Sequence, residues 1–300
     1  MSISKRLKYL LWFVVITITP RKKCGDRLIA LYRFYRSQKR FPSSDKTLSN
    51  ELYRLKISDE MESPIRVFTS DKYLSKFFVK AVVGEQHVVP TIAVLHTEAE
   101  VRGFDYPKNC CIKPTHCSGL FFIRKEGADI PLEAICSWLG ENYYYNTRER
   151  NYKSLKPAII VEPLIFDQAN IEDYKFTCYN NQIGYIQVIT DRAGTAKERV
   201  YDADWNDMVF TVKKPRLERN IERPECFNEM IAACKGLAQY FSLVRIDFYV
   251  HGNHFYVGEI THCPEGGDVF FIPREMEATA SRLLFSPSPS QTGAVNRQAT

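Results

Sequence analysis

The sequence predicts an α+β fold, because strand-like and helix-like segments are mixed along the chain and many of the strands are joined by hairpin turns. Its 300 residues are 45% hydrophobic and 25% charged. This composition is typical of a soluble globular chain with one large core or two smaller lobes. The same order of elements argues against a doubly wound parallel sheet.

The first 60 residues form a basic N-terminal extension with 14 Lys and Arg against 5 Asp and Glu. An apolar run at 9–18 lies between basic residues at 5–8 and at 20–23. About ten residues are too few to cross a bilayer as a helix, which needs about 20. No small-residue cleavage site follows the run, as a signal peptide would require. We therefore expect residues 1–23 to lie on an anionic membrane surface, the alternative being a helix buried against the main body.

The main body is not basic. The whole chain has a net charge of +6 and its first 60 residues have a net charge of +9, so the other 240 residues have a net charge of −3. A nucleic-acid-binding surface would need its Lys and Arg on the main domain, so we expect no nucleic acid partner. The 9 cysteines are an odd number and form no CxxC pair. This usage indicates a reducing, cytoplasmic setting, in which the protein lies free or on the inner face of the membrane.

The first helix of the main domain is predicted from Ser70 to Val83, because capping residues precede apolar positions at helical spacing and Gly84 follows. Apolar and β-branched runs predict strands at 88–95, 110–113, 120–124 and 158–161, with a helix at 132–138 and an aromatic cluster at 143–145. A polar loop at 114–119 joins the second and third of these strands. We expect the elements at about 108–161 to form a subdomain.

The second half of the domain begins with a predicted hairpin of strands 173–178 and 184–189 that turns at Asn180 and Asn181. An amphipathic helix at 225–241 leads into two further strands, 244–250 and 255–261. The tail at 286–300 is polar and rich in Ser and Pro, which predicts disorder. We therefore expect the main domain to cover residues 61–285.

The last two strands each place one carboxylate, Asp247 or Glu259, among residues that should be buried. Alternation along the strand places Arg245 on the same face as Asp247. If the turn at 251–254 has an odd number of residues or the strand pair contains a bulge, Asp247 lies opposite Glu259. A strict two-residue turn at Gly252 and Asn253 would send the two carboxylates to opposite faces.

Two carboxylates side by side on a buried face repel each other and lose hydration, which costs several kcal/mol unless a cation or a proton intervenes. Hard oxygen ligands without nearby Cys suit Mg²⁺ held together with nucleotide phosphates. The spacing of His251, His254 and His262 matches no usual zinc ligand set. The alternative is a network of ion pairs, in which Arg245 binds Asp247 and a lysine binds Glu259 on a solvated sheet face.

Six short motifs follow one another in a recognisable order: Asp71-Lys72, Ile112-Lys113 before a Ser-Gly loop, Val161-Glu-Pro-Leu164, Asp173-Tyr-Lys-Phe176, Val244-Arg-Ile-Asp247 and Gly258-Glu-Ile-Thr261. In this order they resemble the ATP-grasp superfamily. More narrowly, residues 40–275 resemble the TupA-like ATP-grasp proteins of bacterial surface-polysaccharide and teichuronopeptide synthesis. The resemblance implies an ATP-grasp fold, in which two α+β lobes hold the nucleotide between them. It also implies that the domain at 61–285 is catalytic and that the subdomain at about 108–161 bears a lid.

The resemblance also implies the residues of a nucleotide site with ATP and Mg²⁺ as cofactors. Lys72, Lys113 and Lys175 match the positions that reach the phosphates, as point charges suited to a polyanion. The loop with Ser118 and Gly119 corresponds to a phosphate lid, although it has fewer glycines than the family's NHGSGG. The remaining implied residues are Glu162 and Leu164 at the adenine, Asp167 at the ribose, and Asp247 and Glu259 at the metal.

For catalysis, the resemblance implies that Arg245, with Lys175 and Arg192, stabilises charge that develops on the reacting phosphoryl or acyl group. The implied reaction is a carboxylate-amine ligation through an acyl phosphate. Its partners would be a carboxylate-bearing glycan or uronic acid and an amine donor, used in polysaccharide biosynthesis. The alternatives are a glycan kinase of the same fold and a non-catalytic assembly subunit with a degenerate nucleotide site.

Overall fold

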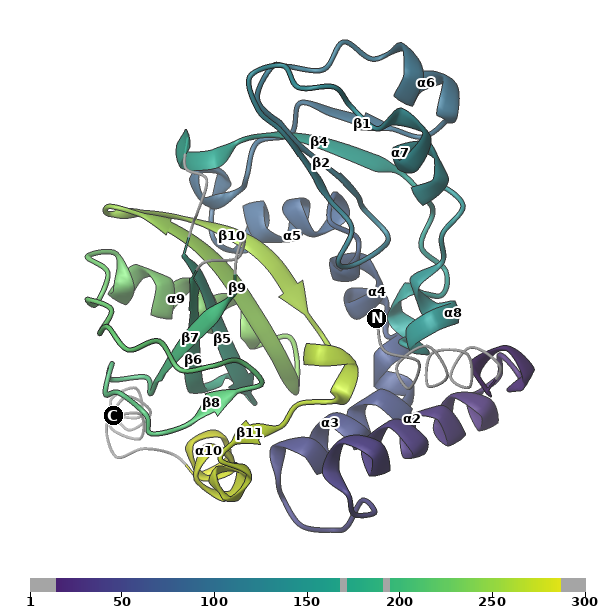
Figure 1. Cartoon of the computed structure of the whole chain (residues 1–300). Helices are drawn as coiled ribbons and strands as arrows, with labels where there is room; N and C mark the ends of the chain where they lie inside the picture. Colours follow the sequence, from purple (N-terminus) through teal and green to yellow (C-terminus); the bar gives the residue numbers. More distant parts are fainter. Residues whose placement is uncertain (1–14, 168–171, 191–194, 287–300) are drawn as a thin grey trace, which may run out of the picture.

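The computed structural model describes residues 15–167, 172–190 and 195–286, which fold into two lobes (Figure 1). Within these residues, the smaller lobe contains a four-stranded sheet in the order β1-β4-β2-β3, and the larger lobe contains a five-stranded sheet in the order β10-β9-β5-β6-β7. Every strand pair in both sheets is antiparallel. The predicted α+β class is confirmed.

The sheets are formed by strands β1 (Ala93–Leu95), β2 (Cys110–Pro114), β3 (Phe122–Arg124), β4 (Ile159–Pro163), β5 (Asp173–Tyr179), β6 (Gln182–Thr190), β7 (Lys197–Tyr201), β9 (Leu243–His251) and β10 (His254–Thr261), and a separate two-stranded ribbon by β8 (Thr211–Val212) and β11 (Phe271–Ile272). The helices are α2 (Lys23–Gln38), α3 (Leu48–Ile57), α4 (Pro64–Ser70), α5 (Leu74–Val82), α6 (Glu98–Gly103), α7 (Leu132–Trp138), α8 (Tyr143–Thr147), α9 (Phe227–Ala238) and α10 (Glu277–Phe285). Short 3₁₀ turns lie at η1 (Asp59–Glu62), η2 (Glu85–His87), η3 (Arg150–Tyr152), η4 (Ile165–Asp167), η5 (Pro264–Gly267) and η6 (Arg274–Met276).

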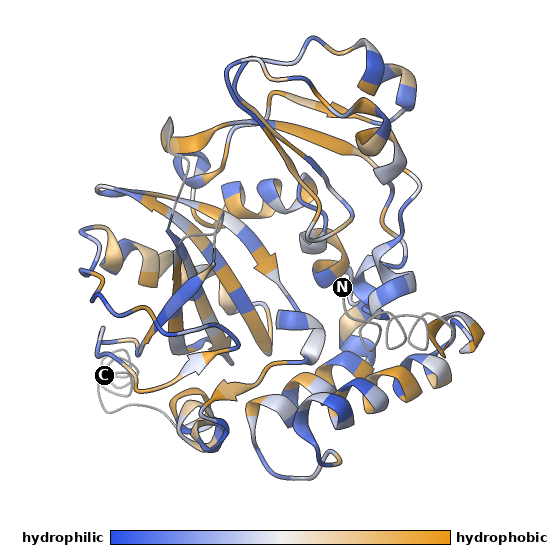
Figure 2. Cartoon of the chain, viewed as in Figure 1, coloured by the Kyte–Doolittle hydropathy of each residue, from blue (hydrophilic) through white to orange (hydrophobic). Residues whose placement is uncertain are grey.

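The main core lies between one face of the five-stranded sheet and helices α5 and α9. Phe176, Ile246 and Phe248 point from the sheet into this core and meet Phe227 and Met230 of α9. Figure 2 shows the alternation of hydrophobic and hydrophilic residues along β9 and β10 that produces the two faces. Burial of these large side chains stabilises the lobe by roughly 1.5–3 kcal/mol each before entropy is counted.

The opposite face of the same sheet is shared between a second core and the polar residues described below. At one end, Tyr185 packs with Leu52 of α3, Leu284 of α10 and Phe271 of β11. The remaining part of this face carries Lys175, Arg245 and Asp247, whose positions on paired strands are directly adjacent. A polar sheet face that is buried in this way needs mutual ion pairing or a bound ligand.

Two predicted elements differ from the structure. The strand expected at 88–95 is shortened to β1, because Pro90 lacks the N–H that a ladder needs. Val88 instead forms an isolated bridge with Val257. The helix expected at 70–83 is divided, since Asp71 Oδ1 accepts the N–H groups of Tyr73 and Leu74 and thereby starts α5 as a new helix.

The other predicted elements are close to the observed ones. The helix at 132–138 has the expected bounds, and the helix expected at 225–241 is α9. The hairpin turns at Asn180 and Asn181, which both have positive φ (44° and 63°) as a tight hairpin turn requires.

The described part of the N-terminal segment packs on the main body. Ile16 is buried, and the Arg148 guanidinium donates hydrogen bonds to the carbonyl oxygens of Ile16, Thr19 and Pro20 at 2.6–3.1 Å. Helix α3, within the expected extension at 1–60, contributes to the second core. Residues 1–14 and 287–300 lie outside the described residues, so membrane contact through 1–23 and disorder of the tail stay predictions. In the part of the chain that the structure describes, no helix is long and apolar enough to span a membrane.

Candidate active site

A β-bulge brings the two predicted metal ligands together. The turn between β9 and β10 has only the two residues Gly252 and Asn253, and His251 pairs with His254 across it. The register then shifts between Val257 and Glu259, so that Glu259 lies opposite Asp247. We expected Asp247 and Glu259 to lie on one face if the turn had an odd number of residues or the strand pair contained a bulge. They lie on one face because of a bulge within β10, away from the turn.

The bulge depends on the absence of a side chain at Gly258. A Cβ added there would lie 2.6 Å from the nearest ring atom of Tyr249, which is closer than carbon atoms approach in proteins. Without a Cβ, the Tyr249 ring crosses the bulged strand. The absence of a side chain at Gly258 thus allows the Tyr249 ring of β9 to pack at this position while Glu259, the next residue, takes the shifted register.

Asp247 lies at the centre of a buried ion-pair network on the sheet face. Arg245 Nε donates to Oδ1 at 2.7 Å and its Nη2 donates to Oδ2 at 2.9 Å, which is a bidentate pair. Lys175 Nζ contacts Asp247 Oδ2 at 2.5 Å and Asp173 Oδ2 at 2.7 Å. Burial alone would raise the pKa of Asp247, but Arg245 and Lys175 outweigh burial and hold this pKa below its ordinary value. The carboxylate is therefore ionised at neutral pH.

Glu259 differs from Asp247 in its surroundings. It is half-buried, and within the described residues no hydrogen bond or ion pair engages its carboxylate. It lines two neighbouring pockets, one between the lobes and one beside α8 and η3. Thr261, opposite Arg245 in the register, accepts a hydrogen bond from Arg245 Nη2 at 3.3 Å. The ion-pair alternative thus describes Asp247 but not Glu259.

The donor set fits Mg²⁺ bound together with a nucleotide. Among the residues that the structure describes, groups of three or more His, Cys, Asp or Glu that could hold a metal ion are absent. Mg²⁺ commonly takes one or two carboxylates together with phosphates and water. A carboxylate has about four lone pairs, and three donors engage Asp247. One lone pair of Asp247 and the Glu259 carboxylate are thus available to a cation. His262 is held instead by Arg66 and Thr69 at 3.0 and 2.8 Å.

Three lysines converge on the pocket between the lobes. Lys72 and Lys113, both predicted, line it together with Lys76, which the sequence reasoning did not identify. Glu162 is buried and bridges Lys76 and Lys113 with two contacts of 2.6 Å. Burial alone would lower the pKa of Lys113, but Glu162 outweighs burial and raises it. The pocket is completed by Val79, Val88, Val89, Val257 and Ile260, with Ser75 and Gly258.

The predicted lid loop is anchored to the first lysine. Lys72 N–H donates to the Thr115 carbonyl at 3.0 Å, and Lys72 Nζ donates to the Cys117 carbonyl. Ser118 faces the second pocket, and Gly119 has a φ of +82° that favours glycine. The loop thus runs along the boundary between the two pockets.

The other predicted residues divide into placed and unplaced ones. Leu164 directly follows β4 and is half-buried, and the neighbouring Phe166 ring lies 5.2 Å from the Tyr256 ring. Asp167 ends the 3₁₀ turn η4, but its side chain lies outside the described residues. Arg192 also lies outside them. For both, the roles at the ribose and in catalysis stay predictions.

The second pocket is a cavity of about 330 Å³ that the sequence reasoning did not anticipate. It shares Glu259 with the lysine-lined pocket. Its lining residues come from five separate segments of the chain: Arg33; Ser118; Tyr143, Thr147, Glu149 and Tyr152; Arg245; and Glu259, Thr261, Cys263, Glu265 and Gly266. Arg33 comes from α2, so the N-terminal helix contributes to the wall. No local sequence pattern joins these residues, because the tertiary fold alone brings them together.

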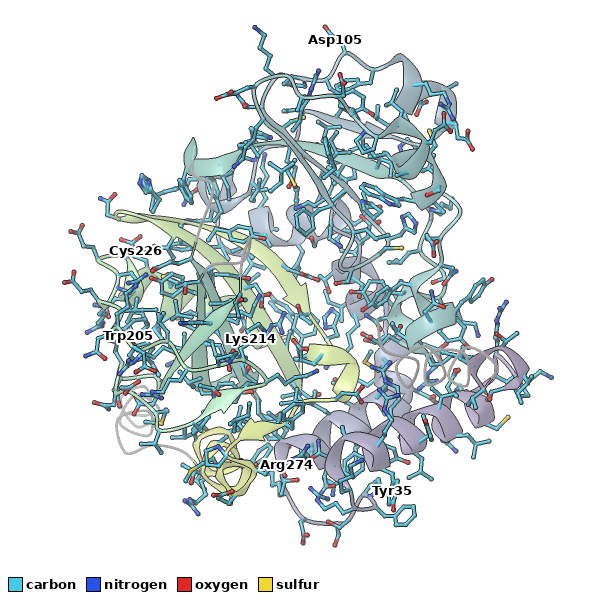
Figure 3. The ribbon with its side chains drawn as sticks, in the orientation of Figure 1. Tyr35, Asp105, Trp205, Lys214, Cys226 and Arg274 are labelled. Carbon is cyan, nitrogen blue, oxygen red and sulfur yellow. The ribbon has the colours of Figure 1, made fainter. Side chains whose placement is uncertain are left out.

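A basic loop after β8 lies beside the sheet face that carries Lys175, Arg245 and Asp247. Lys213 Nζ pairs with Glu265 at 3.0 Å, and Lys214, labelled in Figure 3, lies close to the buried Glu198. Burial raises the pKa of Glu198 to about 7, against the lowering effect of hydrogen bonds from Val212 N–H and Gln187. This loop was also missed, because a Lys-Lys pair in a loop is usually solvated.

Comparison with known proteins places these features in context. A family model described as TupA-like ATPgrasp matches residues 50–281. A search of curated proteins finds no match. The fold is similar to D-alanine-D-alanine ligase from Helicobacter pylori, with 18% identity, 67% of this chain and 56% of that chain covered, and a TM-score of 0.40.

Two further solved structures resemble the chain to a comparable degree. One is D-alanine-D-alanine ligase from Bacillus anthracis complexed with ATP, with 18% identity, 65% and 55% coverage and a TM-score of 0.36. The other is L-amino acid ligase from Bacillus licheniformis, with 12% identity, 73% and 50% coverage and a TM-score of 0.41. The chain therefore spans between half and three fifths of the length of these solved structures.

Proposed function

The chain belongs to the TupA-like ATPgrasp family and has the ATP-grasp fold, and from this premise we propose that it is an ATP- and Mg²⁺-dependent ligase that joins a carboxylate to an amine. The observation that carries the proposal is the position of Glu259. This residue faces Asp247 across the bulged hairpin and separates the lysine-lined pocket from the second cavity. A nucleotide in one pocket and an acceptor in the other would meet at Glu259.

The lysine-lined pocket supports binding of the nucleotide. Lys72, Lys76 and Lys113 provide positive charge for the phosphates, and the valines of the same pocket provide an apolar wall for the base. Asp247 and Glu259 would hold Mg²⁺, which neutralises phosphate charge and orients the phosphoryl group when bound. Glu162 keeps Lys76 and Lys113 in place before the nucleotide enters.

Arg245 supports the second stage of the reaction. Its guanidinium lines the second cavity and is fixed in orientation by Asp247 and Thr261. The transfer of a γ-phosphoryl group to a substrate carboxylate gives an acyl phosphate, and negative charge develops when an amine attacks its carbonyl carbon. A preorganised cation beside that carbonyl stabilises the transition state. Lys175 from the neighbouring strand β5 also binds Asp247 and completes the arrangement.

We propose a carboxylate-bearing glycan or uronic acid as acceptor and an amine as donor, in bacterial surface-polysaccharide synthesis on the cytoplasmic side of the membrane. The cations Arg33 and Arg245 on the cavity wall support an anionic acceptor. Both are ion-paired, Arg33 with Asp268 and Arg245 with Asp247, and are therefore held in place for recognition.

Mass spectrometry of reactions that contain ATP, Mg²⁺, a panel of uronates and a panel of amino acids tests the proposal, with phosphate release followed in parallel. An amide product with equimolar phosphate is expected. A phosphorylated sugar without phosphate release would instead identify a glycan kinase. If ATP turnover is absent, or survives unchanged in D247N and E259Q, this site is not catalytic and the assembly-subunit alternative holds.

A further inference from the structure

The second cavity contains a buried carboxylate that has no partner. Glu149 is 4% exposed and lines the cavity directly after α8. Its Oε1 is buried and accepts no hydrogen bond, and within the described residues no ion pair reaches Glu149. Most buried carboxylates are paired, because an unpaired buried charge is strongly unfavourable. An orphaned carboxylate at a cavity wall therefore points to a cationic ligand.

The cations nearest to Glu149 are already engaged by other groups. Arg33 Nε and Nη2 bind Asp268 at 3.0 and 2.8 Å. Lys56 is buried, and its Nζ donates to the Gly266 carbonyl at 2.5 Å. Both act on Glu149 only from a distance, and burial raises the pKa of Glu149 to about 7 in spite of them. A ligand cation would supply the missing partner.

The other acidic residues of the cavity do not share this property. Glu265 is paired with Lys213 at 3.0 Å. Glu259 faces Asp247 and belongs to the proposed Mg²⁺ site. Tyr143 of α8 and Tyr152 of η3 line the same cavity near Glu149, and their rings pack against each other with centroids 4.7 Å apart. Aromatic rings in a cavity with a carboxylate suit an alkylammonium group, since aromatic rings attract cations as well.

We propose that the Glu149 carboxylate binds the protonated amine of the donor substrate, so that the wall of the second cavity around Glu149 is the amine subsite of the ligase. This inference rests on the proposed function. It assigns the two substrates to different walls of one cavity, with the acyl group at Arg245 and Glu259 and the amine at Glu149. The segment from α8 to η3 thereby selects the amine.

The corresponding step is balanced in atoms and charge. The bound ammonium gives one proton to Glu149, and the lone pair of the resulting amine attacks the acyl phosphate carbon. A C–N bond forms and the C–O bond to the phosphate breaks. The phosphate leaves with that electron pair and takes the second proton of the nitrogen, and Glu149 then releases its proton to water.

The experiment compares wild type, E149Q and E229Q with two nucleophiles, Glu229 being an exposed residue of α9 that does not line the cavity. Hydroxylamine, a small and largely neutral nucleophile at pH 7.5, traps the acyl phosphate as a hydroxamate and does not need a carboxylate to bind it. The second nucleophile is the amino acid from the panel that wild type converts to an amide. Binding of that amino acid without ATP is measured by calorimetry, and thermal melts verify that each variant is folded.

E149Q is expected to form hydroxamate at the wild-type rate, while its KM for the amino acid rises by about 10- to 100-fold, as expected for the loss of one charge-assisted hydrogen bond. Calorimetry should show the same loss of affinity. E229Q, whose carboxylate is exposed on α9, should keep both values within about twofold, a range expected for a peripheral charge.

Other results would overturn the inference in distinguishable ways. If wild type forms hydroxamate but no amide with any amino acid of the panel, the amine subsite alone is contradicted. The same conclusion follows if wild type forms hydroxamate and wild type and E149Q have equal KM values and equal affinities for the amino acid. Equal loss of hydroxamate and amide in a folded E149Q assigns Glu149 to the first stage and also contradicts it. Absence of hydroxamate from wild type contradicts the proposed function, and the amine subsite with it.

Discussion

Glu259 lies opposite Asp247 on adjacent strands, although the turn that joins these strands has only two residues. The β-bulge that follows Val257 makes this pairing possible, because one extra residue in a strand reverses the faces of all later side chains. The site therefore depends on a local irregularity that neither strand pattern contains.

Substitution of Gly258 by Ala should destabilise the fold and remove ATP turnover. The added Cβ meets the Tyr249 ring at 2.6 Å, so either the ring or the bulge must move. Overpacking of this kind costs about 1–3 kcal/mol. Urea denaturation with an ATPase assay measures both effects. G103A is the matched control, since a Cβ at Gly103 meets no atom within 4 Å. A G258A protein as stable and active as G103A would show that the bulge is not required.

The two carboxylates should respond differently to neutralisation. D247N leaves Arg245 and Lys175 without their buried partner, so its free energy of unfolding should fall by about 3–5 kcal/mol. E259Q removes a carboxylate that has no protein partner and should change the free energy of unfolding by less than about 0.5 kcal/mol. Both variants should lose turnover. Equal destabilisation by the two substitutions would contradict the described surroundings of Glu259.

Lys76 should be as important for ATP as the two lysines that the motifs identified. K76M removes a charge from the lysine-lined pocket and leaves Glu162 with one partner. The KM for ATP should rise by about 10-fold or more, as for loss of a charge-assisted contact. Lys80, one turn further along α5, is about half exposed and pairs with exposed Glu85, so K80M serves as the control. Identical ATP KM values for K76M and K80M would exclude Lys76 from the site.

The stability of the protein should decrease between pH 5 and pH 8 because of Glu198. Its pKa is raised from 4.5 to about 7 by burial, so its stabilising contribution is complete below about pH 4.5 and is lost as the pH rises through 7. The shift corresponds to at most about 3 kcal/mol. The free energy of unfolding of E198Q, relative to that of wild type, should therefore be higher at pH 8 than at pH 5. Denaturant unfolding at the two pH values measures this difference between variant and wild type. If the difference does not change with pH, the raised pKa of Glu198 is contradicted.

Part of this molecule is predictable from sequence because its signals are local. The Asn180-Asn181 turn, the helix after Pro131 and the alternation in β9 depend on neighbours in the chain, and each was placed correctly. The bulge at Gly258 was left open because strand alternation does not show where an extra residue enters. The sequence allowed either outcome, and tertiary packing against Tyr249 decided it.

The missed residues share a different cause. Lys76 lies one helical turn after Lys72, but its role depends on Glu162 in another lobe. Arg33 and Glu149 are 116 positions apart in the sequence and meet only in the folded cavity. Contacts of this kind have no periodic signature, because they link elements that are far apart in the sequence. The predicted Asp167 and Arg192 gain no further support from the described residues.

The most direct test of the central claim is a crystal structure with Mg²⁺ and a non-hydrolysable ATP analogue. The account predicts one Mg²⁺ with oxygen atoms of both Asp247 and Glu259 at about 2.1 Å and with the phosphates beside Lys72, Lys76 and Lys113. If the ion and phosphates bind elsewhere, or if only one of these carboxylates reaches the metal while the analogue is bound, the proposed site is wrong.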